Sequence, residues 1–249
     1  MVDCKKQNKC SAVKCDEEFE ISRPHNSGCL YKFFIGHKFN RTIKLLPFPI
    51  ENLKVLDSCC GSGMISEYYA RNGAKVTGID LSEDAIERAR IRKERYKFEA
   101  YFRVANATKL PFSDNSFDIV SVHDGLHHLK EPWRAVKEMV RVAKRGVIII
   151  EPAKALVTKI SILLGISKKY EDKDFVYRFT KRELENWLKK DSIDKVISKK
   201  YIMYYPHKPG IIFKFLGLPV IFTIVKAGFN LINIFFGRFG NKIQVIGLK

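Results

Sequence analysis

The chain has 249 residues, of which 46% are hydrophobic and 12% aromatic, and it carries a formal net charge of +18. These proportions supply ample material for a core and predict one α/β domain with additions. The six cysteines exclude a disulfide scaffold, because a bridge between the adjacent Cys59 and Cys60 would be strained. We therefore expect a reducing, cytoplasmic location, and the lack of an apolar stretch after the first lysines predicts no secretory signal.

The positive charge is concentrated in the C-terminal part of the chain. Residues 1–151 have a net charge of +6, whereas residues 152–249 have a net charge of +12, and no acidic residue follows Asp194. A basic segment of this kind is typical of proteins that contact nucleic acid or an anionic membrane.

Two segments precede the predicted domain. We expect residues 1–19 to form a flexible polar leader. Its Cys4, Cys10 and Cys15 are separated by five and four residues, unlike the paired ligands of zinc, so no metal site is predicted. Residues 20–46 are aromatic and basic and are expected to form one or two helices.

Strands and helices then alternate. Strands are expected at residues 54–59, 75–80, 101–106, 117–123 and 146–151, and helices at residues 63–72, 83–95 and 132–143. This alternation predicts a parallel sheet, in which right-handed connections place the C-terminal tip of every strand on one edge. The tips carry Asp57, Asp80, Asn106 and His123. We therefore expect these side chains to meet in one ligand crevice.

The connection within Val55–Gly63 is the most informative. It predicts a buried strand that ends in a tight glycine turn before a helix. Glycine lets the backbone approach a ligand, and the start of the helix offers free N–H groups. Asp80, at the tip of the next strand, is placed to accept hydrogen bonds from a ribose. These features predict a nucleotide-cofactor site, and Ser66, at the third glycine position of the dinucleotide fingerprint, argues against NAD.

Three further blocks carry a family resemblance. They are NATKLPFSDNSFDIV at residues 106–120, Leu126–His128 and Glu138–Val142. With the glycine turn, they make residues 50–152 resemble the class I S-adenosylmethionine (SAM)-dependent methyltransferases, in particular the ubiquinone/menaquinone-type group. The resemblance implies an α/β, Rossmann-like, doubly wound and mostly parallel sheet of seven strands, with SAM as cofactor and S-adenosylhomocysteine (SAH) as product. It also implies that residues 47–152 bind SAM and that the helices of residues 20–46 cover it.

The resemblance assigns cofactor contacts to ten residues. They are Asp57, Cys59, Cys60, Gly61, Gly63, Asp80, Leu81, Asn106, Ala107 and His123. Asp57 and the glycine turn would line the methionine moiety, and Asp80 would bind the ribose hydroxyls. Cys59 stands where glycine is commonest. Asn106 replaces the usual aspartate and can accept from the adenine amino group only without charge, so weaker cofactor binding is expected.

Candidate catalytic groups cluster after the fourth strand. His123, Asp124 and His127 could hold a general base, because an imidazole suits proton removal from a phenol or hydroxyl near neutral pH. In many relatives of the resembled group, the pair His127–His128 instead packs beneath the cofactor. Neighbouring histidines are expected to point apart, which disfavours a metal site.

Three other residues are candidates for the substrate pocket. Tyr31 and His37, in the segment before the domain, are expected to contact substrate, and Tyr31 is a further catalytic candidate. Glu151 ends the fifth strand and either faces the pocket or caps the edge of the sheet.

Residues 153–249 are expected to complete the sheet. Phe175–Phe179 has the pattern of a strand, and Thr180 and Glu183 form a capping box that opens a helix to about Lys190. Lys195–Tyr205 and Lys242–Leu248 are expected to be the last two strands.

Residues 208–238 form a basic, apolar insertion before the last strand. Within it, Thr223, Lys226, Asn230 and Asn233 recur at helical spacing on one narrow stripe. The apolar arc is wider than a surface helix needs, so this helical insertion either dips into lipid or packs against the core or a second subunit. A spanning helix is disfavoured, because Lys226 interrupts the apolar run.

We therefore predict a SAM-dependent methyltransferase that acts on a small-molecule or lipid-like acceptor, cytoplasmic or peripheral to an anionic membrane. Two alternatives remain open at the level of sequence. The acceptor could be RNA, which would explain the positive charge through phosphate contacts. The chain could also be a non-catalytic SAM-binding protein, since Cys59 and Asn106 depart from the usual pattern.

Overall fold

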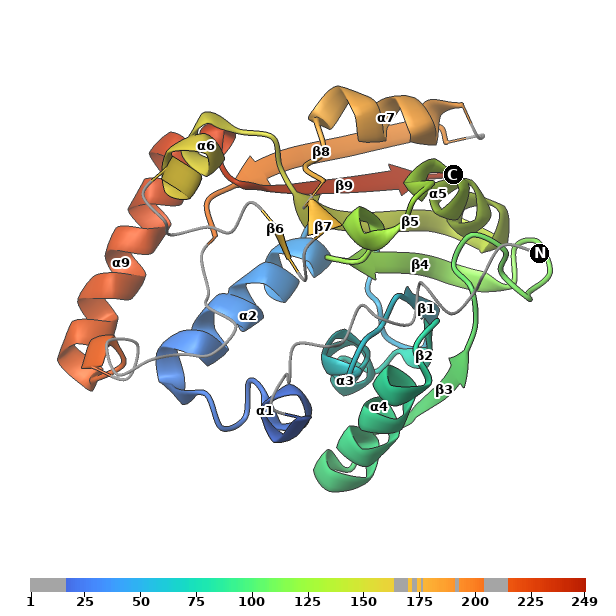
Figure 1. Cartoon of the computed structure of the whole chain (residues 1–249), viewed down its shortest axis with the longest axis horizontal. Coiled ribbons are helices and arrows are strands. Elements are labelled where there is room, and N and C mark those ends of the chain that lie inside the picture. The colour runs from blue at the N-terminus through green and yellow to red at the C-terminus, as the bar shows by residue number, and fades with distance from the viewer. Residues whose placement is uncertain (1–16, 164–169, 172–173, 176, 191–192, 204–214) are drawn as a thin grey trace.

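The protein forms one central sheet with helices on both faces (Figure 1). The computed structural model describes residues 17–163, 170–171, 174–175, 177–190, 193–203 and 215–249. The sheet has seven strands in the order β3-β2-β1-β4-β5-β9-β8. Its strands are β1 (Lys54–Ser58), β2 (Lys75–Asp80), β3 (Ala100–Val104), β4 (Phe117–His123), β5 (Ala143–Pro152), β8 (Lys195–Tyr201) and β9 (Lys242–Leu248).

The first five strands are parallel, as the alternating sequence predicted. Val55 of β1 lies opposite Val76 of β2 on one side and Ile119 of β4 on the other. The last strand, β9, runs antiparallel between β5 and β8. The Rossmann-like, mostly parallel seven-stranded sheet is thereby confirmed, and the tips of β1, β2 and β4 lie on one edge, as expected.

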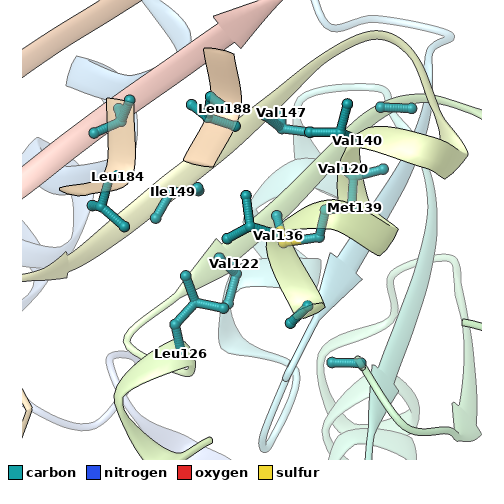
Figure 2. Close-up of a cluster of buried hydrophobic side chains, with 14 of the residues drawn as sticks. Val120, Val122, Leu126, Val136, Met139, Val140, Val147, Ile149, Leu184 and Leu188 are labelled. Carbon is teal, nitrogen blue, oxygen red and sulfur yellow. The ribbon is translucent and has the colours of Figure 1, made fainter. Parts of the chain in front are cut away.

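Helices cover the two faces of the sheet. They are α2 (Gly28–Ile43), α3 (Met64–Arg71), α4 (Glu83–Tyr96), α5 (Pro132–Val142) and α7 (Lys181–Lys189), and a further helix, α6 (Leu156–Leu163), follows β5. Figure 2 shows how α5 and α7 close one face: Val136 and Leu184 point toward Val122 and Ile149 of the sheet. Each fully buried side chain of this size stabilises the fold by about 1.5–3 kcal/mol. The opposite face is closed mainly by α2 and α3, with Tyr31, Phe39 and Tyr69 fully enclosed.

The N-terminal segment is ordered earlier than the sequence suggested. Helix α1 spans Glu17–Ser22, so residues 17–19 are helical rather than part of a flexible leader. The remainder of the predicted leader, with its three cysteines, lies outside the described residues. Arg92 of α4 holds α1 in place: its fully buried guanidinium donates to the carbonyl oxygens of Ile21 and Glu20 at 2.8 and 3.1 Å.

The segment between β5 and β8 differs in part from its sequence pattern. The predicted strand Phe175–Phe179 is not continuous in the described residues, where β7 covers only Asp174–Phe175 and pairs with β6 (Tyr170–Glu171). Phe179 instead forms an isolated bridge with Ala153. The capping box at the start of α7 is confirmed, with Thr180 and Glu183 bonding reciprocally. Strand β8 ends at Tyr201 because Ile202 turns to bond Asn233.

The predicted helical insertion before the last strand is α9 (Pro219–Phe236), followed by a short 3-10 turn, η3 (Gly237–Phe239). By length and composition alone, Pro219–Phe239 could cross a membrane. No residue of α9 is fully buried, although Phe222, Val225 and Phe229 pack as partly buried side chains against the core cluster that includes α2. Phe222 and Phe229 contact α2, where Phe229 lies 4.9 Å from Phe34 between ring centroids.

Candidate active site

The turn between β1 and α3 is built from residues with left-handed backbones. Cys59, Gly61 and Gly63 have φ angles of +57°, +53° and +75°. A Cβ atom on Gly63 would lie 3.0 Å from the ring of Phe102 and 3.1 Å from Ala89, whereas one on Gly61 would meet no atom within 4 Å. Gly63 is therefore required for packing, and Gly61 opens onto free space at the edge of the sheet.

Cys59 occupies a position that favours glycine. Its positive φ explains why glycine is commonest there, because L-residues pay steric strain in this region. Its side chain lies against Gly125, where an added Cβ atom would come within 2.6 Å of the Cys59 Cβ. Burial raises the pKa of the Cys59 thiol, so this thiol remains protonated and unreactive.

Asp80 is held at the tip of β2 by two backbone groups. Its Oδ2 accepts from the Gly61 N–H at 2.9 Å, and its Oδ1 accepts from the Ser82 N–H at 3.0 Å. Ser82 in turn caps α4 by accepting from Ala85. The neighbouring Leu81 is 42% exposed, which leaves an apolar side chain uncovered directly beside this carboxylate.

Asp57 is buried beneath the same turn. Its Oδ2 accepts a 2.6 Å hydrogen bond from Ser66, the residue at the missing third glycine. Its Oδ1 is buried and accepts no hydrogen bond within the described structure. Burial raises the pKa of Asp57 to about 7, although the Ser66 hydrogen bond opposes the shift. Asp57 therefore titrates near neutral pH and has one free acceptor, and its ionised form is suited to a positively charged partner.

Asn106 uses its amide oxygen locally. The oxygen accepts from the Thr108 N–H at 2.9 Å and from the Thr108 hydroxyl at 2.8 Å. The predicted bond from an adenine amino group would have to share or displace these contacts, which strengthens the expectation of weak cofactor binding. Ala107 is buried, next to the exposed Asn106.

Glu151 organises the loop after β4. One of its oxygens accepts from the Gly125 and Leu126 N–H groups at 2.9 and 2.7 Å, and the other lies 2.7 Å from His127 Nδ1. Burial alone would lower the pKa of His127, but the Glu151 charge outweighs it and the pKa is raised. The expectation that His127 and His128 point apart is wrong, because their ring centroids lie 4.1 Å apart. The 3-10 turn η2 (Leu126–His128) places both rings together.

His123 is enclosed at the tip of β4. Its Nε2 lies 3.1 Å from the Tyr69 hydroxyl, and its Nδ1 is buried without a hydrogen-bond partner among the described residues. Burial, reinforced by the charge of Lys38, holds the pKa of His123 well below its usual range. His123 is therefore neutral and a weak base.

Asp124 is bound by two lysines. Its carboxylate accepts from Lys38 of α2 at 2.6 Å and from Lys242 of β9. Burial would raise the pKa of Asp124, but Lys242 and Lys38 hold it well below its usual range. These contacts disfavour Asp124 as a base and favour a role in joining α2 to the last strand, β9.

The two candidates from the N-terminal segment lie in different places. Tyr31 is fully buried in α2, and burial raises the pKa of its hydroxyl. His37 lies on another face of the same helix, where its ring is 5.0 Å from that of Phe229 in α9. The structure therefore separates His37 from the strand tips and places it at the α2–α9 contact.

Several residues of the site escaped sequence reasoning. Lys38 and Lys242 are joined through Asp124 although 204 positions separate them in the printed sequence, and no local pattern indicates that pairing. Tyr69 and Ser66 could have been found, because their spacing places both on the buried face of α3. Within the described residues, no group of three potential metal ligands occurs.

Known proteins resemble this chain mainly in residues 56–150, which match the family model of a methyltransferase domain. A demethylmenaquinone methyltransferase of Renibacterium salmoninarum is 41% identical over 93 residues, or 37% of this chain and 38% of that protein. A ubiquinone biosynthesis O-methyltransferase of Alkalilimnicola ehrlichii is 37% identical over 98 residues, or 39% of this chain and 40% of that protein. The matches thus span about two fifths of these relatives.

Solved structures match over nearly the whole chain. Magnesium protoporphyrin IX methyltransferase of Synechocystis PCC 6803, solved with bound SAH, superposes with a TM-score of 0.64 at 17% identity, covering 98% of each chain. A SAM-dependent methyltransferase from Thermotoga maritima gives a TM-score of 0.63 at 17% identity, again with 98% coverage of each chain. The resemblance to the class I methyltransferases is confirmed over residues 56–150, which match the methyltransferase-domain model, and the whole chain shares the Rossmann-like fold of these solved structures.

Proposed function

We propose that this protein transfers a methyl group from SAM to a small-molecule acceptor. The observation that carries this function is the edge of the sheet where Asp57, Gly61 and Asp80 meet. There, a buried carboxylate with a free oxygen, an uncovered glycine and a half-exposed carboxylate line one turn. These groups match three parts of SAM: the ammonium group, the methionine chain that would contact the backbone of the turn, and the ribose diol.

The cofactor would be held by residues of this chain in separate roles. Asp57 would bind the ammonium group through Oδ1, and Asp80 would accept from the ribose hydroxyls while keeping its backbone contacts. Leu81 would cover one face of the adenine. SAM supplies a methyl group that is already activated by a sulfonium, so the protein has mainly to orient the acceptor and remove its proton.

We assign the general base to His127 rather than to His123 or Asp124. Glu151 lies 2.7 Å from Nδ1 of His127 and fixes the orientation of a ring that can exchange a proton near neutral pH. His123 has a strongly lowered pKa, and Asp124 is neutralised by Lys38 and Lys242, so both are poorer bases. Glu151 is a positioning residue, because it acts through His127 and through the loop that carries it.

The acceptor is proposed to be lipid-like. Two relatives are named for steps in menaquinone and ubiquinone biosynthesis, and the apolar, basic α9 lies next to α2, which lines the site through Lys38. A location in the cytoplasm and at the membrane periphery follows from the same proposal. The free oxygen of Asp57 and the uncovered face of Gly61 favour cofactor binding.

Two measurements test this function. Calorimetric titration with SAH should show binding, and SAM labelled in its methyl group should transfer label to a lipid extract of host cells. Glu151→Gln should lower kcat and shift its pH profile with little change in SAH affinity, because the positioning of His127 is lost. SAH binding without label transfer to lipid, RNA or soluble pools would identify a non-catalytic binding protein, and absence of SAH binding would overturn the proposal.

A further inference from the structure

A second surface lies on the outer side of α2, away from the strand tips. A groove of about 960 Å³ runs between α2 and α9. Five cationic side chains and no acidic one line it: Lys32, Arg41, Lys44, Lys199 and Lys226. None of the five forms an ion pair with any residue that the structure describes, in contrast to Lys38 and Lys242 at the site. The groove therefore concentrates positive charge without internal compensation.

The walls of the groove also hold side-chain nitrogens without a hydrogen-bond partner in the described residues. The Nε atom of Arg41 and the Nε2 atom of His37 are buried and have no hydrogen-bond partner within the described part of the chain. The Nζ of Lys226 lies 5.9 Å from the centroid of the Phe33 ring, so the ammonium group makes a cation–π contact with this side chain. Uncompensated cations beside an unsatisfied guanidinium N–H are suited to phosphate oxygens.

The adjoining side of α9 is apolar and uncovered. Val220, Ile224, Leu231, Ile234 and Phe235 are between 54% and 75% exposed. At 100° per residue they fall on the side of the helix opposite Phe229, which packs on α2. Thr223, Lys226 and Asn230 lie between these two sides. The helix thus has a packed side, a cationic flank toward the groove and a bare apolar side.

We propose that α9 and the α2–α9 groove form a docking surface for an anionic phospholipid bilayer. The apolar side of α9 would enter the boundary of the acyl chains, and the groove cations would bind lipid phosphates beside it. In Figure 1, α9 lies at the left margin of the molecule beside α2, with the sheet farther toward the centre, so a flat surface could approach α9 from outside.

Charge complementarity favours this occupant over the alternatives. A second copy of the chain would bring the same five cations to the contact, and no acidic residue follows Asp194 to neutralise them. RNA would satisfy the cations but would leave the large aliphatic side chains of α9 in water. A bilayer with anionic lipids satisfies both parts of the surface. Docking extends beyond the proposed methyl transfer and does not depend on it.

The test is flotation of the full chain with vesicles of phosphatidylcholine, with and without phosphatidylglycerol. We expect binding to the anionic vesicles that weakens with salt, and roughly fivefold weaker binding for each of Lys32→Gln and Lys226→Gln. Ile224→Ser combined with Phe235→Ser should weaken binding to a similar or greater extent. Lys137→Gln on α5 and Tyr101→Ser on β3 are matched controls from exposed sites elsewhere, and they should bind as the unaltered chain does.

Each other outcome overturns the docking surface. Lack of flotation, or equal loss in the controls, would remove the membrane as occupant. A dimer in light scattering that Ile224→Ser dissociates would assign the apolar side to a second copy. Tighter binding to polyuridylate than to vesicles would assign the groove to RNA. Retention in carbonate-washed membranes would indicate a spanning helix. Titration with SAH on the same variants tests the proposed function separately, because none of these residues belongs to the site.

Discussion

The methyltransferase core and the α2–α9 surface contain similar apolar residues, but these are buried in the core and exposed on the surface. In the core, side chains such as Val122 and Ile149 are fully buried, and charged groups such as Asp124 are paired. On α9, Ile224 and Ile234 are mostly exposed, and the cations of the groove have no ion-pair partners in the described structure. In the core, apolar side chains are buried and a charged group such as Asp124 is paired. Burial and pairing are incomplete where we propose that another molecule binds.

The largest expected effect lies in the anchoring of α1. Arg92→Leu would remove three backbone contacts and leave Glu67, which Arg92 now pairs at 2.9 Å, buried with less compensation. We expect a loss of about 3–5 kcal/mol in the free energy of unfolding, measured with urea. Arg95 lies about one turn further along the same helix and pairs with Glu18 at the surface, so Arg95→Leu should leave stability nearly unchanged. Equal effects would show that α1 is not held by Arg92.

Cofactor binding should depend on Asp80. In Asp80→Asn one of the two backbone N–H groups at this position loses its acceptor, and the charge toward the ribose is lost. We expect SAH affinity to fall by about 3 kcal/mol, or about 100-fold, in calorimetry. Asp84→Asn, exposed in the first turn of α4, is the control and should bind SAH as the unaltered chain does. Unchanged affinity in Asp80→Asn would exclude the ribose assignment.

The two glycines of the turn should separate packing from binding. Gly63→Ala places a Cβ atom against Phe102 at a positive φ, and we expect it to cost about 1–3 kcal/mol in thermal or urea unfolding. Gly61→Ala meets the same backbone strain without a close contact, so it should destabilise less and reduce SAH affinity more. The reverse order would mean that Gly61, not Gly63, supports the turn.

The pH dependence should report Asp57. Because its pKa in the folded chain is raised from 3.8 to about 7, ionising it costs stability, and the unliganded protein should lose stability as pH rises through this range. The cofactor ammonium requires the ionised form, so SAH affinity should rise with pH by up to about tenfold per unit below about pH 7. Calorimetry in two buffers of different ionisation enthalpy would detect the released proton.

Asp57→Asn is the control for this dependence. Its SAH affinity should be weaker and nearly independent of pH over the same range, because the titrating group is gone. A pH dependence that survives in Asp57→Asn would assign the effect to another titrating group instead.

The smallest effect is expected on the bare side of α9. Ile224→Ser should change the free energy of unfolding by less than about 0.5 kcal/mol, since the side chain packs little in the folded chain. Phe229→Ser in the same helix should cost several times more, because Phe229 contacts Phe34 and His37. Strong destabilisation by Ile224→Ser in the monomer would contradict an uncovered apolar side.

The sequence by itself determined which segments of the core are strands and helices. It also determined which residues lie at the strand tips. The alternation of strands and helices, the capping box at Thr180 and the turn at Gly61 and Gly63 are local features, so they could be predicted without coordinates. The resemblance extended this prediction to the cofactor, although Asn106 is engaged with Thr108 in a way that no pattern indicated.

Tertiary structure alone decided which distant groups meet. Lys38 and Lys242 come together on Asp124, Glu151 supports His127, and Lys226 of α9 joins Lys32 of α2 in one groove. The exposure of the apolar side of α9 was likewise undecided, since the same composition suits a core helix. Such pairings depend on how elements pack across the sheet, and the energy of a contact between distant residues leaves no periodic trace in the chain that forms it.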